Sequence, residues 1–422
     1  MRKLKKAIGM MLCTALVASV LGACGGQSGS GTGSTGGSAD SSSGSTESAS
    51  EEGGASESET TGGGEASSDL KFKIGASGPL TGGAALYGIA VVNGAKIAVD
   101  EINANGGIAG YQIEYQSQDD QHDAEKAVNA YNSLKDWGMQ VFVGTTTTTP
   151  CIAVADVSAE DGMFQITPSA SSAEVIENDN VFQVCFTDPN QGRASAQYIA
   201  EHNLATKIGI IYDSSDVYSS GIRDTFVEEA AAQGLEIVSN EAFTADSKTD
   251  FSTQLQKAQS AGAELMFLPF YYTEASIVLT QANNMGFAPI FFGVDGMDGI
   301  LSVENFDTSL AEGVLLLTPF AADAQDELTQ NFVTNYQNEF GEIPIQFAAD
   351  AYDAVYTVKT AIEAAGVTPD MSMEDIGAAL IDVMPTISVD GLTGEGMTWD
   401  ASGTVSKEPR AVVIKDGVYV TP

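Results

Sequence analysis

The sequence predicts an α/β fold made of two doubly wound lobes, each a parallel sheet with helices on both faces. From Leu70 onward, short apolar runs alternate with longer amphipathic stretches, as strands and helices do in parallel sheets. These runs are more numerous than the strands of a usual single sheet. About 353 residues follow residue 69 of the 422, which is enough for two separate cores.

The apolar runs are the predicted strands. We expect strands at Lys71–Ala76, Tyr111–Gln116, Met139–Val143, Phe164–Ile166, Val181–Phe186, Lys207–Tyr212, Glu236–Val238, Leu265–Leu268, Ile290–Phe292 and Gly313–Leu317. The helices expected between them include Ala85–Ala104, Ala124–Trp137, Asp250–Ala261, Glu274–Met285, Glu327–Glu339 and Ala348–Ala364. Periodicity alone does not place the boundary between the lobes.

The first 24 residues predict export. A cationic segment with Arg2 and three lysines precedes the apolar run Ala7–Gly22, which is too short to span a bilayer comfortably. The run ends in Leu21-Gly22-Ala23-Cys24, which resembles the lipobox of bacterial lipoproteins. This resemblance implies removal of residues 1–23 and diacylation of Cys24, and two acyl chains would anchor the protein stably. The alternative is ordinary cleavage near Ala23 with a soluble product.

Residues 24–69 are expected to form a lipid-anchored flexible linker. After Cys24 they comprise Gly, Ser, Thr, Ala, acidic residues and one Gln, with no aromatic, large aliphatic or basic residue. Such a segment buries too little apolar surface to offset its ordering entropy, and random-coil scaling gives it a span of roughly 35–40 Å. The glycines of Gly31-Thr-Gly33-Ser-Thr-Gly36 match a dinucleotide-binding motif by composition only, because no strand precedes them and no helix follows.

The chain is strongly acidic. Its formal net charge is −39, and removing the four cationic residues of the signal segment lowers this charge to −43. A polyanion of this kind does not bind nucleic acid through its phosphates, and its charge keeps it soluble. Of the four cysteines, Cys13 leaves with the signal segment and Cys24 carries the anchor. A disulfide and two buried thiols are both possible for Cys151 and Cys185.

Polar residues gather in loops that follow predicted strands. The loops richest in Ser, Thr, Tyr and Asp are Ser77–Tyr87, Thr145–Thr149, Thr167–Ser172, Asp213–Ser220, Phe270–Thr273 and Gly293–Asp298. In open parallel sheets, ligands bind beyond the C-terminal ends of the strands. Helix capping explains any one of these loops, but together they predict a cleft lined with hydrogen-bond donors.

The sequence favours a binding protein over an enzyme. It has only two histidines, His122 and His202, and no zinc-binding spacing, serine-hydrolase elbow or phosphate-binding loop. The acidic stretch 119–123 lacks the spaced oxygen ligands of a calcium loop, and we expect Asp123 to cap the following helix. We therefore predict no catalytic residue, no metal and no cofactor.

Short motifs follow one another in order between residues 70 and 415. They are Ile74-Gly-Ala-Ser-Gly-Pro-Leu-Thr-Gly82, Tyr87-Gly88, Asn93-Gly94-Ala95, Asp100-Glu101-Ile102-Asn103, Gly106-Gly107-Ile108, Asp119-Asp120, Ile166-Thr167-Pro168-Ser169-Ala170-Ser171, Phe186-Thr-Asp-Pro-Asn-Gln-Gly192, Asp250-Phe251-Ser252 and Tyr352-Asp-Ala-Val-Tyr356. In this order they resemble the type I periplasmic binding proteins of the leucine/isoleucine/valine class. The resemblance implies two Rossmann-like lobes that are joined by three crossover segments and close like a clamshell. The N-lobe would comprise residues 70–189 and 319–386, and the C-lobe residues 190–318 and 387–422.

The resemblance also implies residues for the two charged ends of an amino acid. Thr148 and Ser171, with the backbone of Ser169, fall where family members bind the α-carboxylate, above helix N-termini whose free N–H groups suit an anion. The run Thr145–Thr149 leaves open which threonine makes this contact. Asp295 falls where the family uses an acidic residue for the α-ammonium; otherwise it is a turn residue before a glycine.

Three tyrosines complete the implied ligand-binding site. Tyr218 and Tyr271 match C-lobe aromatic residues at the cleft, and Tyr87 matches one that closes over the ligand side chain. Packing in the cleft without ligand contact is the alternative for all three. Asp298 would be a further polar contact or a helix cap.

The function implied by the resemblance is that of the substrate-binding component of an ABC importer. It would capture an amino acid of the branched-chain type and deliver it to the permease subunits, as a monomer anchored on the extracytoplasmic face of the cell membrane. The alternatives are the same fold binding an amide, urea or an aromatic acid, and a ligand-sensing module. A ligand without an ammonium group would leave Asp295 without its partner, so the charge of the ligand distinguishes between these hypotheses.

Overall fold

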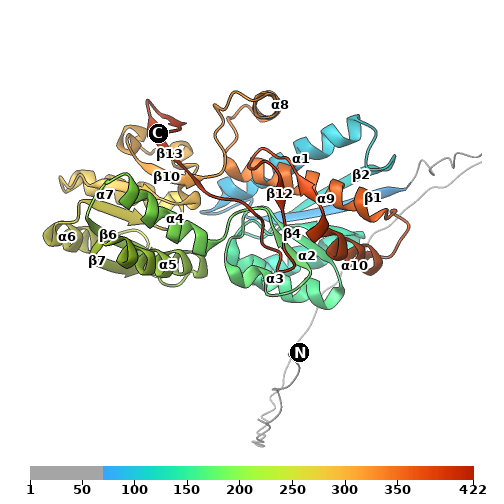
Figure 1. The fold of residues 1–422 in the computed structure, drawn as a ribbon, viewed down its shortest axis with the longest axis horizontal. Helices are drawn as coiled ribbons and strands as arrows, with labels where there is room; N and C mark the ends of the chain where they lie inside the picture. The colour runs from blue at the N-terminus through green and yellow to red at the C-terminus, as the bar shows by residue number, and fades with distance from the viewer. Residues whose placement is uncertain (1–69) are drawn as a thin grey trace, which may run out of the picture. The chain divides into compact units, whose positions relative to one another are not determined.

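The computed structural model describes residues 70–422 and builds them around two main sheets (Figure 1). The predicted signal segment, the Cys24 anchor and the linker lie outside the described residues. The first sheet is entirely parallel and has the order β2-β1-β3-β4-β5. Its strands are β1 (Lys71–Gly78), β2 (Gln112–Asp119), β3 (Val141–Val143), β4 (Phe164–Thr167) and β5 (Val181–Gln183).

The second sheet is mixed and has the order β14-β13-β10-β9-β8-β6-β7. It comprises β6 (Lys207–Asp213), β7 (Glu236–Phe243), β8 (Leu265–Leu268), β9 (Ile290–Gly293), β10 (Leu315–Thr318), β13 (Arg410–Lys415) and β14 (Val418–Val420). Strands β13 and β14 are antiparallel to their neighbours and were not among the predicted strands. A separate antiparallel pair joins β11 (Ser388–Val389) to β12 (Met397–Thr398).

Helices cover both sheets, as the alternation of runs predicts. They are α1 (Ala85–Ala104), α2 (Ala124–Trp137), α3 (Thr148–Asp161), α4 (Asp188–Glu201), α5 (Val217–Gln233), α6 (Ser252–Ala261), α7 (Tyr272–Asn284), α8 (Glu327–Phe340), α9 (Gln346–Ala365) and α10 (Met373–Val383). In Figure 1, α4 to α7 gather around the second sheet, and α1, α2, α9 and α10 around the first. The two-lobed α/β fold predicted from the sequence is therefore confirmed.

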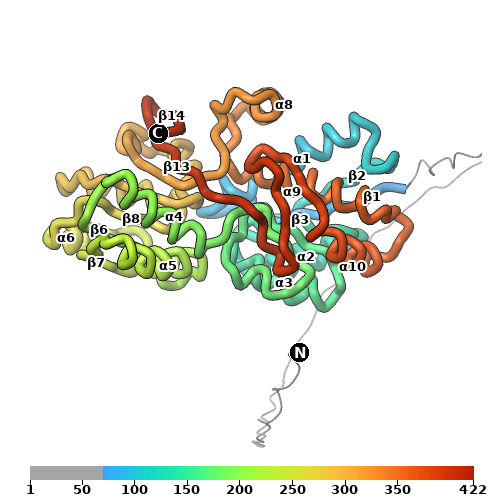
Figure 2. The backbone as a smooth tube through the Cα atoms, viewed as in Figure 1, coloured from blue at the N-terminus to red at the C-terminus, as the bar shows by residue number. Residues whose placement is uncertain are grey.

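The chain passes between the two sheets three times, and the tube in Figure 2 follows these passages. We call residues 184–187, 319–326 and 399–409 the crossover segments, because they connect β5 to α4, β10 to α8 and β12 to β13. The predicted assignment of everything from residue 387 onward to the C-lobe fits this path poorly. The Trp399 Nε1–H donates to the Gln183 carbonyl at 2.7 Å, and the Gln183 N–H donates to the Gly403 carbonyl at 3.0 Å. We therefore propose a boundary near residue 408.

Two helices of the first lobe cross in close contact near the cleft. A Cβ atom on Gly94 in α1 would lie 2.0 Å from the carbonyl oxygen of Ala348 in α9, so only glycine permits this approach. In the first turns of the same two helices, the rings of Tyr87 and Phe347 pack with their centroids 4.3 Å apart. Helix packing thus places two aromatic side chains at the edge of the first sheet.

Two other features bear on the sequence analysis. Cys151 and Cys185 are free, buried thiols, so the question of a disulfide is answered in favour of the thiols. Burial raises the pKa of Cys151 to about 11. Within residues 70–422, no helix combines the length and apolar character needed to cross a membrane.

Candidate functional site

Most hydroxyl groups of the run Thr145–Thr149, at the junction of β3 and α3, form contacts within the protein. The Thr145 hydroxyl donates to the Thr147 carbonyl at 3.1 Å, and the Thr146 hydroxyl donates to the Ser77 carbonyl at 3.4 Å. The Thr147 hydroxyl lies 2.9 Å from Nδ1 of His122, whereas Thr149 is exposed. Thr148 is buried, and its hydroxyl only accepts a bond, so its proton is available to a ligand.

Ser169 and Ser171 lie beside Thr148. The Ser171 N–H donates to Oγ1 of Thr148 at 3.3 Å, and the Ser169 hydroxyl donates to the Thr146 carbonyl at 2.6 Å. Oγ of Ser171 is buried and has no hydrogen-bond partner among residues 70–422. Because α3 begins at Thr148, its first N–H groups have no partner within the helix. The arrangement offers hydroxyl and N–H donors to an anion.

Asp295 lies in a short helical turn, Asp295–Met297, directly after β9. The Tyr218 hydroxyl donates to Oδ1 of Asp295 at 2.5 Å, and the Gly296 N–H donates to the same oxygen at 2.7 Å. The Gln191 side-chain oxygen accepts from the Asp295 N–H at 3.2 Å. Two donors thus hold Oδ1, Gln191 holds the backbone of the same residue, and Asp295 is only 2% exposed.

Burial raises the pKa of Asp295 to about 7, although the hydrogen bonds from Tyr218 and the Gly296 N–H act in the opposite direction. A buried carboxylate without a cation partner is costly, and either a proton or a ligand cation relieves this cost. The buried cation Lys407 pairs with a different carboxylate, with its Nζ 3.1 Å from Oδ1 of Asp350. Asp295 therefore suits a cationic group on a ligand.

The predicted tyrosines form an aromatic wall with Asp295. The rings of Tyr218 and Tyr271 stack with centroids 5.0 Å apart, and the Tyr87 ring contacts the Tyr271 ring edge-on at 5.5 Å. The Tyr87 hydroxyl donates to the Gly296 carbonyl, which links the first lobe to the turn that carries Asp295. The structure thus brings Tyr87, Tyr218, Tyr271 and Asp295 into one cluster.

Further hydrogen bonds join the lobes around Tyr87. Its hydroxyl accepts from the Tyr272 N–H at 3.2 Å, and the Leu86 N–H donates to the Tyr272 hydroxyl at 3.3 Å. The Thr273 hydroxyl donates to the Gly83 carbonyl at 2.9 Å. The lobes are therefore in direct contact over the site, which is a closed arrangement.

Asp188 connects the two halves of the predicted site, and the sequence analysis missed it. It is the first residue of α4, and its N–H donates to the Ser171 carbonyl at 2.8 Å. It is 1% exposed, and neither carboxylate oxygen has a hydrogen-bond partner in the described part of the chain. Burial raises its pKa well above the usual range, the adjacent Ser171 hydroxyl acts in the opposite direction, and the Asp295 carboxyl raises it further. Asp188 is thus a second buried acid at this site.

Gln191 and Phe347 were also missed. Nε2 of Gln191, three residues after Asp188, is buried and has no partner in the described region. Phe347 packs on Tyr87, as noted above. The sequence signal for Asp188 and Gln191 was their place in the motif Phe186–Gly192 after a predicted strand. Phe347 carried no such signal, because it lies directly before the predicted helix Ala348–Ala364 and in none of the polar loops.

The acidic stretch 119–123 has a structural role. Asp119 accepts from the Leu80 N–H at 2.8 Å and from the Thr81 hydroxyl at 2.6 Å, which organises the turn after β1. Asp123 accepts from the Lys126 N–H and caps α2, as predicted. No group of three or more potential metal-ligating side chains occurs within residues 70–422.

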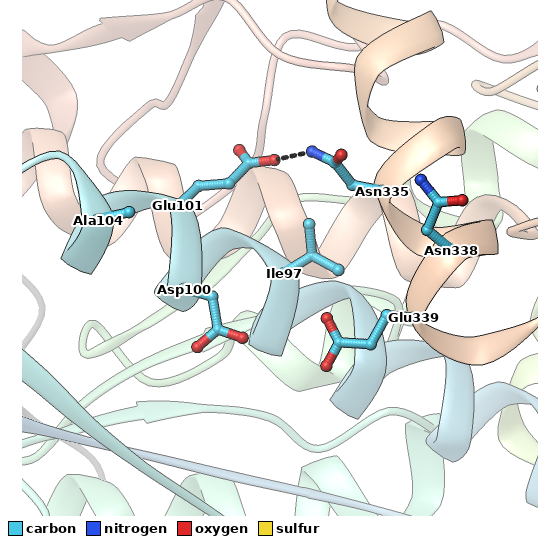
Figure 3. Close-up of a pocket in the computed structure, with 7 residues that line it drawn as sticks. All are labelled: Ile97, Asp100, Glu101, Ala104, Asn335, Asn338 and Glu339. Carbon is cyan, nitrogen blue, oxygen red and sulfur yellow. Dashed lines mark hydrogen bonds between the residues drawn. The ribbon is translucent and has the colours of Figure 1, made fainter.

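A surface pocket of about 410 Å³ lies between α1 and α8, away from this site (Figure 3). Its polar lining is mostly acidic or amide, and the Asn335 side chain donates to Oε1 of Glu101 at 2.9 Å. Lys96 pairs with Asp100 and Glu339, two other lining residues. Asp100, Glu101, Asn335 and Glu339 are thus already engaged in hydrogen bonds or ion pairs within the protein.

Two α/β lobes in contact over a buried cluster of hydroxyl, acidic and aromatic groups define a solute-binding protein rather than an enzyme. Comparison with known proteins agrees with this class. The chain belongs to the periplasmic binding protein family, whose model matches residues 71–417. Proteins of this family bind solutes outside the cytoplasm, which agrees with the export predicted from the first 24 residues.

Individual relatives support this assignment. The chain is 30% identical over 339 residues to Leu/Ile/Val-binding protein homolog 3 of Brucella melitensis biotype 1. This match covers 78% of this chain and 88% of that protein. The substrate binding protein LivJ of a branched-chain amino acid transporter from Streptococcus pneumoniae, solved with isoleucine, has a TM-score of 0.75 and 29% identity, with 83% of this chain and 100% of that chain covered. The leucine binding protein LivK from Thermotoga maritima has a TM-score of 0.74 and 25% identity, with coverages of 83% and 97%.

Proposed function

We propose that this protein captures an amino acid of the branched-chain type for an ABC importer. The proposal rests on two kinds of group that Asp188 connects, because its N–H bonds the Ser171 carbonyl and its carboxyl lies near that of Asp295. Thr148 and Ser171 present donors at the start of α3, and Asp295 presents a buried carboxylate held by Tyr218. A zwitterion is the ligand whose two ends match these groups.

The α-carboxylate would bind the Thr148 hydroxyl, the Ser171 hydroxyl and the free N–H groups of α3. The α-ammonium would lie between Asp295 and Asp188, neither of which forms an ion pair within residues 70–422. Charge-assisted hydrogen bonds of this kind are stronger in a site from which closure excludes water. Both charged ends would be satisfied only in the closed form.

The side chain would face the aromatic wall. The side chains of Tyr87, Tyr271 and Phe347 are uncharged. The centroid of the Tyr87 ring lies 5.5 Å from that of Tyr271 and 4.3 Å from that of Phe347. Aromatic surface favours an aliphatic or aromatic side chain over a charged one. Relatives named for leucine, isoleucine and valine support the aliphatic choice.

We also propose that the protein works at the extracytoplasmic face of the cell membrane, beside its permease. The lipid anchor at Cys24 and the acidic linker would keep the binding lobes near the permease, and the permease would recognise the closed form. Metabolic labelling with palmitate tests the anchor, because a Cys24→Ser variant should lose the label and appear in the medium. Label retained in that variant would contradict the anchor without affecting the ligand assignment.

Ligand identity is tested by a thermal-shift panel of the twenty amino acids, followed by calorimetry. A ligand at a hundred times its dissociation constant adds about 2.7 kcal/mol to the free energy of unfolding, so a true ligand gives a clear shift. Leucine should bind, whereas its 2-oxo acid, which lacks the ammonium, and isoamylamine, which lacks the carboxylate, should not. A shift with benzoate or an amide and none with any amino acid would favour the alternative ligand class.

A further inference from the structure

Asp298 joins the two lobes through the end of a helix. It lies three residues after Asp295 and is 5% exposed. Its Oδ2 atom accepts from the N–H of Gln346 at 2.8 Å, and Gln346 is the first residue of α9 in the other lobe. A carboxylate at this position satisfies an unpaired N–H and is favoured by the helix dipole.

Helix α9 has no capping side chain of its own within the described chain. Its N-cap residue is Ile345, whose side chain cannot accept a hydrogen bond. By contrast, α2, α8 and α10 are each capped by the residue that precedes them, namely Asp123, Asp326 and Ser372. The cap of α9 therefore comes from a different lobe.

Asp298 is fixed on its own side by the turn that carries Asp295. The Asp298 N–H donates to the Asp295 carbonyl at 2.9 Å, and the next residue, Gly299, donates to the Tyr419 hydroxyl at 3.0 Å. The first turn of α9 in turn carries Phe347, which packs on Tyr87. The movement that brings Asp295 to a ligand thus also brings Asp298 to α9.

We infer that Asp298 is a positioning residue that holds the closed form by capping α9 across the cleft, and so slows ligand release. The inference rests on the proposed amino acid function, because closure is measured through a bound ligand. Asp298 itself need not touch the ligand. Its effect is on how long the lobes stay together, and hence on the dissociation rate more than on the association rate.

The test compares Asp298→Ala with Ser372→Ala in the full chain, using leucine as the probe. Ser372 caps α10 within the first lobe, where its hydroxyl accepts from the Asp375 N–H at 3.1 Å. Loss of a helix cap corresponds to about 2- to 30-fold in an equilibrium. Asp298→Ala should therefore weaken leucine binding by that factor, mainly through faster dissociation in stopped-flow measurements. Ser372→Ala should leave both rates unchanged.

A second measurement addresses the contact itself. Hydrogen exchange should show the first turn of α9 protected in the leucine-bound wild type and unprotected in Asp298→Ala, with Asp298→Asn, which keeps an acceptor oxygen, in between. Equal rates and equal exchange in wild type and Asp298→Ala would overturn the inference, as would an equal loss of affinity in Ser372→Ala. If the wild type binds no amino acid at all, the proposed function fails first, and the exchange data then test the cap alone.

Discussion

The Tyr218 hydroxyl connects the side chain of Asp295 to the backbone of the next residue, Gly296. It donates to Oδ1 of Asp295 at 2.5 Å and accepts from the Gly296 N–H at 2.9 Å. The carboxylate is therefore oriented before any ligand arrives. An oriented acceptor binds more tightly than a mobile one, because less entropy is lost when the ligand binds. This relationship leads to the first prediction.

Replacing Tyr218 with Phe should keep the stacking on Tyr271 and remove the hydrogen bond to Asp295. Hydrogen bonds to charged groups contribute about 1.5–3 kcal/mol, so leucine affinity should fall roughly 10- to 150-fold in calorimetry. Asp295→Asn should reduce it at least as much. Tyr198→Phe, on the outer part of α4, is the matched control and should bind like the wild type. An unchanged affinity in Tyr218→Phe would remove Asp295 from the ammonium site.

Ligand affinity should depend on pH through Asp295. Burial raises its pKa to about 7, so the ligand-free protein holds a proton there below that pH, and the ammonium must displace it. Affinity for leucine should therefore fall as pH decreases below 7, approaching tenfold per pH unit. Calorimetry from pH 5 to 8 measures this, and Asp295→Asn should flatten the profile. A wild-type profile that is already flat would contradict the prediction.

The same shift predicts an opposite trend for the ligand-free protein. An unfolded Asp titrates near pH 4, so between about pH 4 and 7 the folded chain keeps a proton that the unfolded chain releases. The contribution of Asp295 to stability is therefore lost as pH rises through this window. The melting temperature of the wild type relative to Asp295→Asn should fall over that range. A rising difference would mean that Asp295 is ionised in the ligand-free protein.

Thr148 and Thr149 form a natural pair of test positions at the start of α3. Thr148 is buried beside Ser171, whereas its neighbour is exposed. Thr148→Val should reduce leucine affinity about tenfold or more, because a donor to the carboxylate is lost. Thr149→Val should change affinity less than twofold, which calorimetry resolves. If the two variants bind equally, another threonine of the run makes the contact.

The buried pair of Lys407 and Asp350 should matter for stability rather than for ligand binding. Both side chains are at most 2% exposed, and removing one partner of a buried pair costs about 3–5 kcal/mol. Lys407→Met should therefore lower the free energy of unfolding in urea by that amount. Lys359→Met, which breaks an exposed pair with Glu363, should lower it by about 0.5 kcal/mol or less. Equal effects of the two substitutions would contradict the prediction.

The sequence predicted the regular parts of the fold well. Helices α1 and α2 begin and end where the periodicity places them, because amphipathic pattern and capping act over a few residues. Strands β13 and β14 were not predicted. The pairing of β13 depends on β10, about a hundred residues earlier, and no local pattern encodes a partner at that distance. Strand β14 pairs with β13 across Asp416-Gly417, a local turn signal that the sequence analysis overlooked.

The predicted site residues lie together in the structure, and their ligand roles remain predictions. What the sequence could not supply was the state of each polar atom. That the Thr146 hydroxyl is used by the Ser77 carbonyl, or that the Asp188 carboxylate has no partner in the described region, follows only from tertiary packing. The family resemblance indicated which sequence positions form the ligand site. Burial in the structure then distinguishes between neighbouring residues of the same type.

The path of the third crossover segment has a mechanical consequence. Lys407 is fixed to α9 of the first lobe through Asp350, and Arg410 already pairs with Thr318 in the second sheet. Only Glu408 and Pro409 lie between these two attachments. A rotation that opens the lobes must therefore be absorbed there by very few backbone torsions, one of which the proline ring fixes. The molecule should open about a narrow, well-defined hinge axis rather than flex along its length.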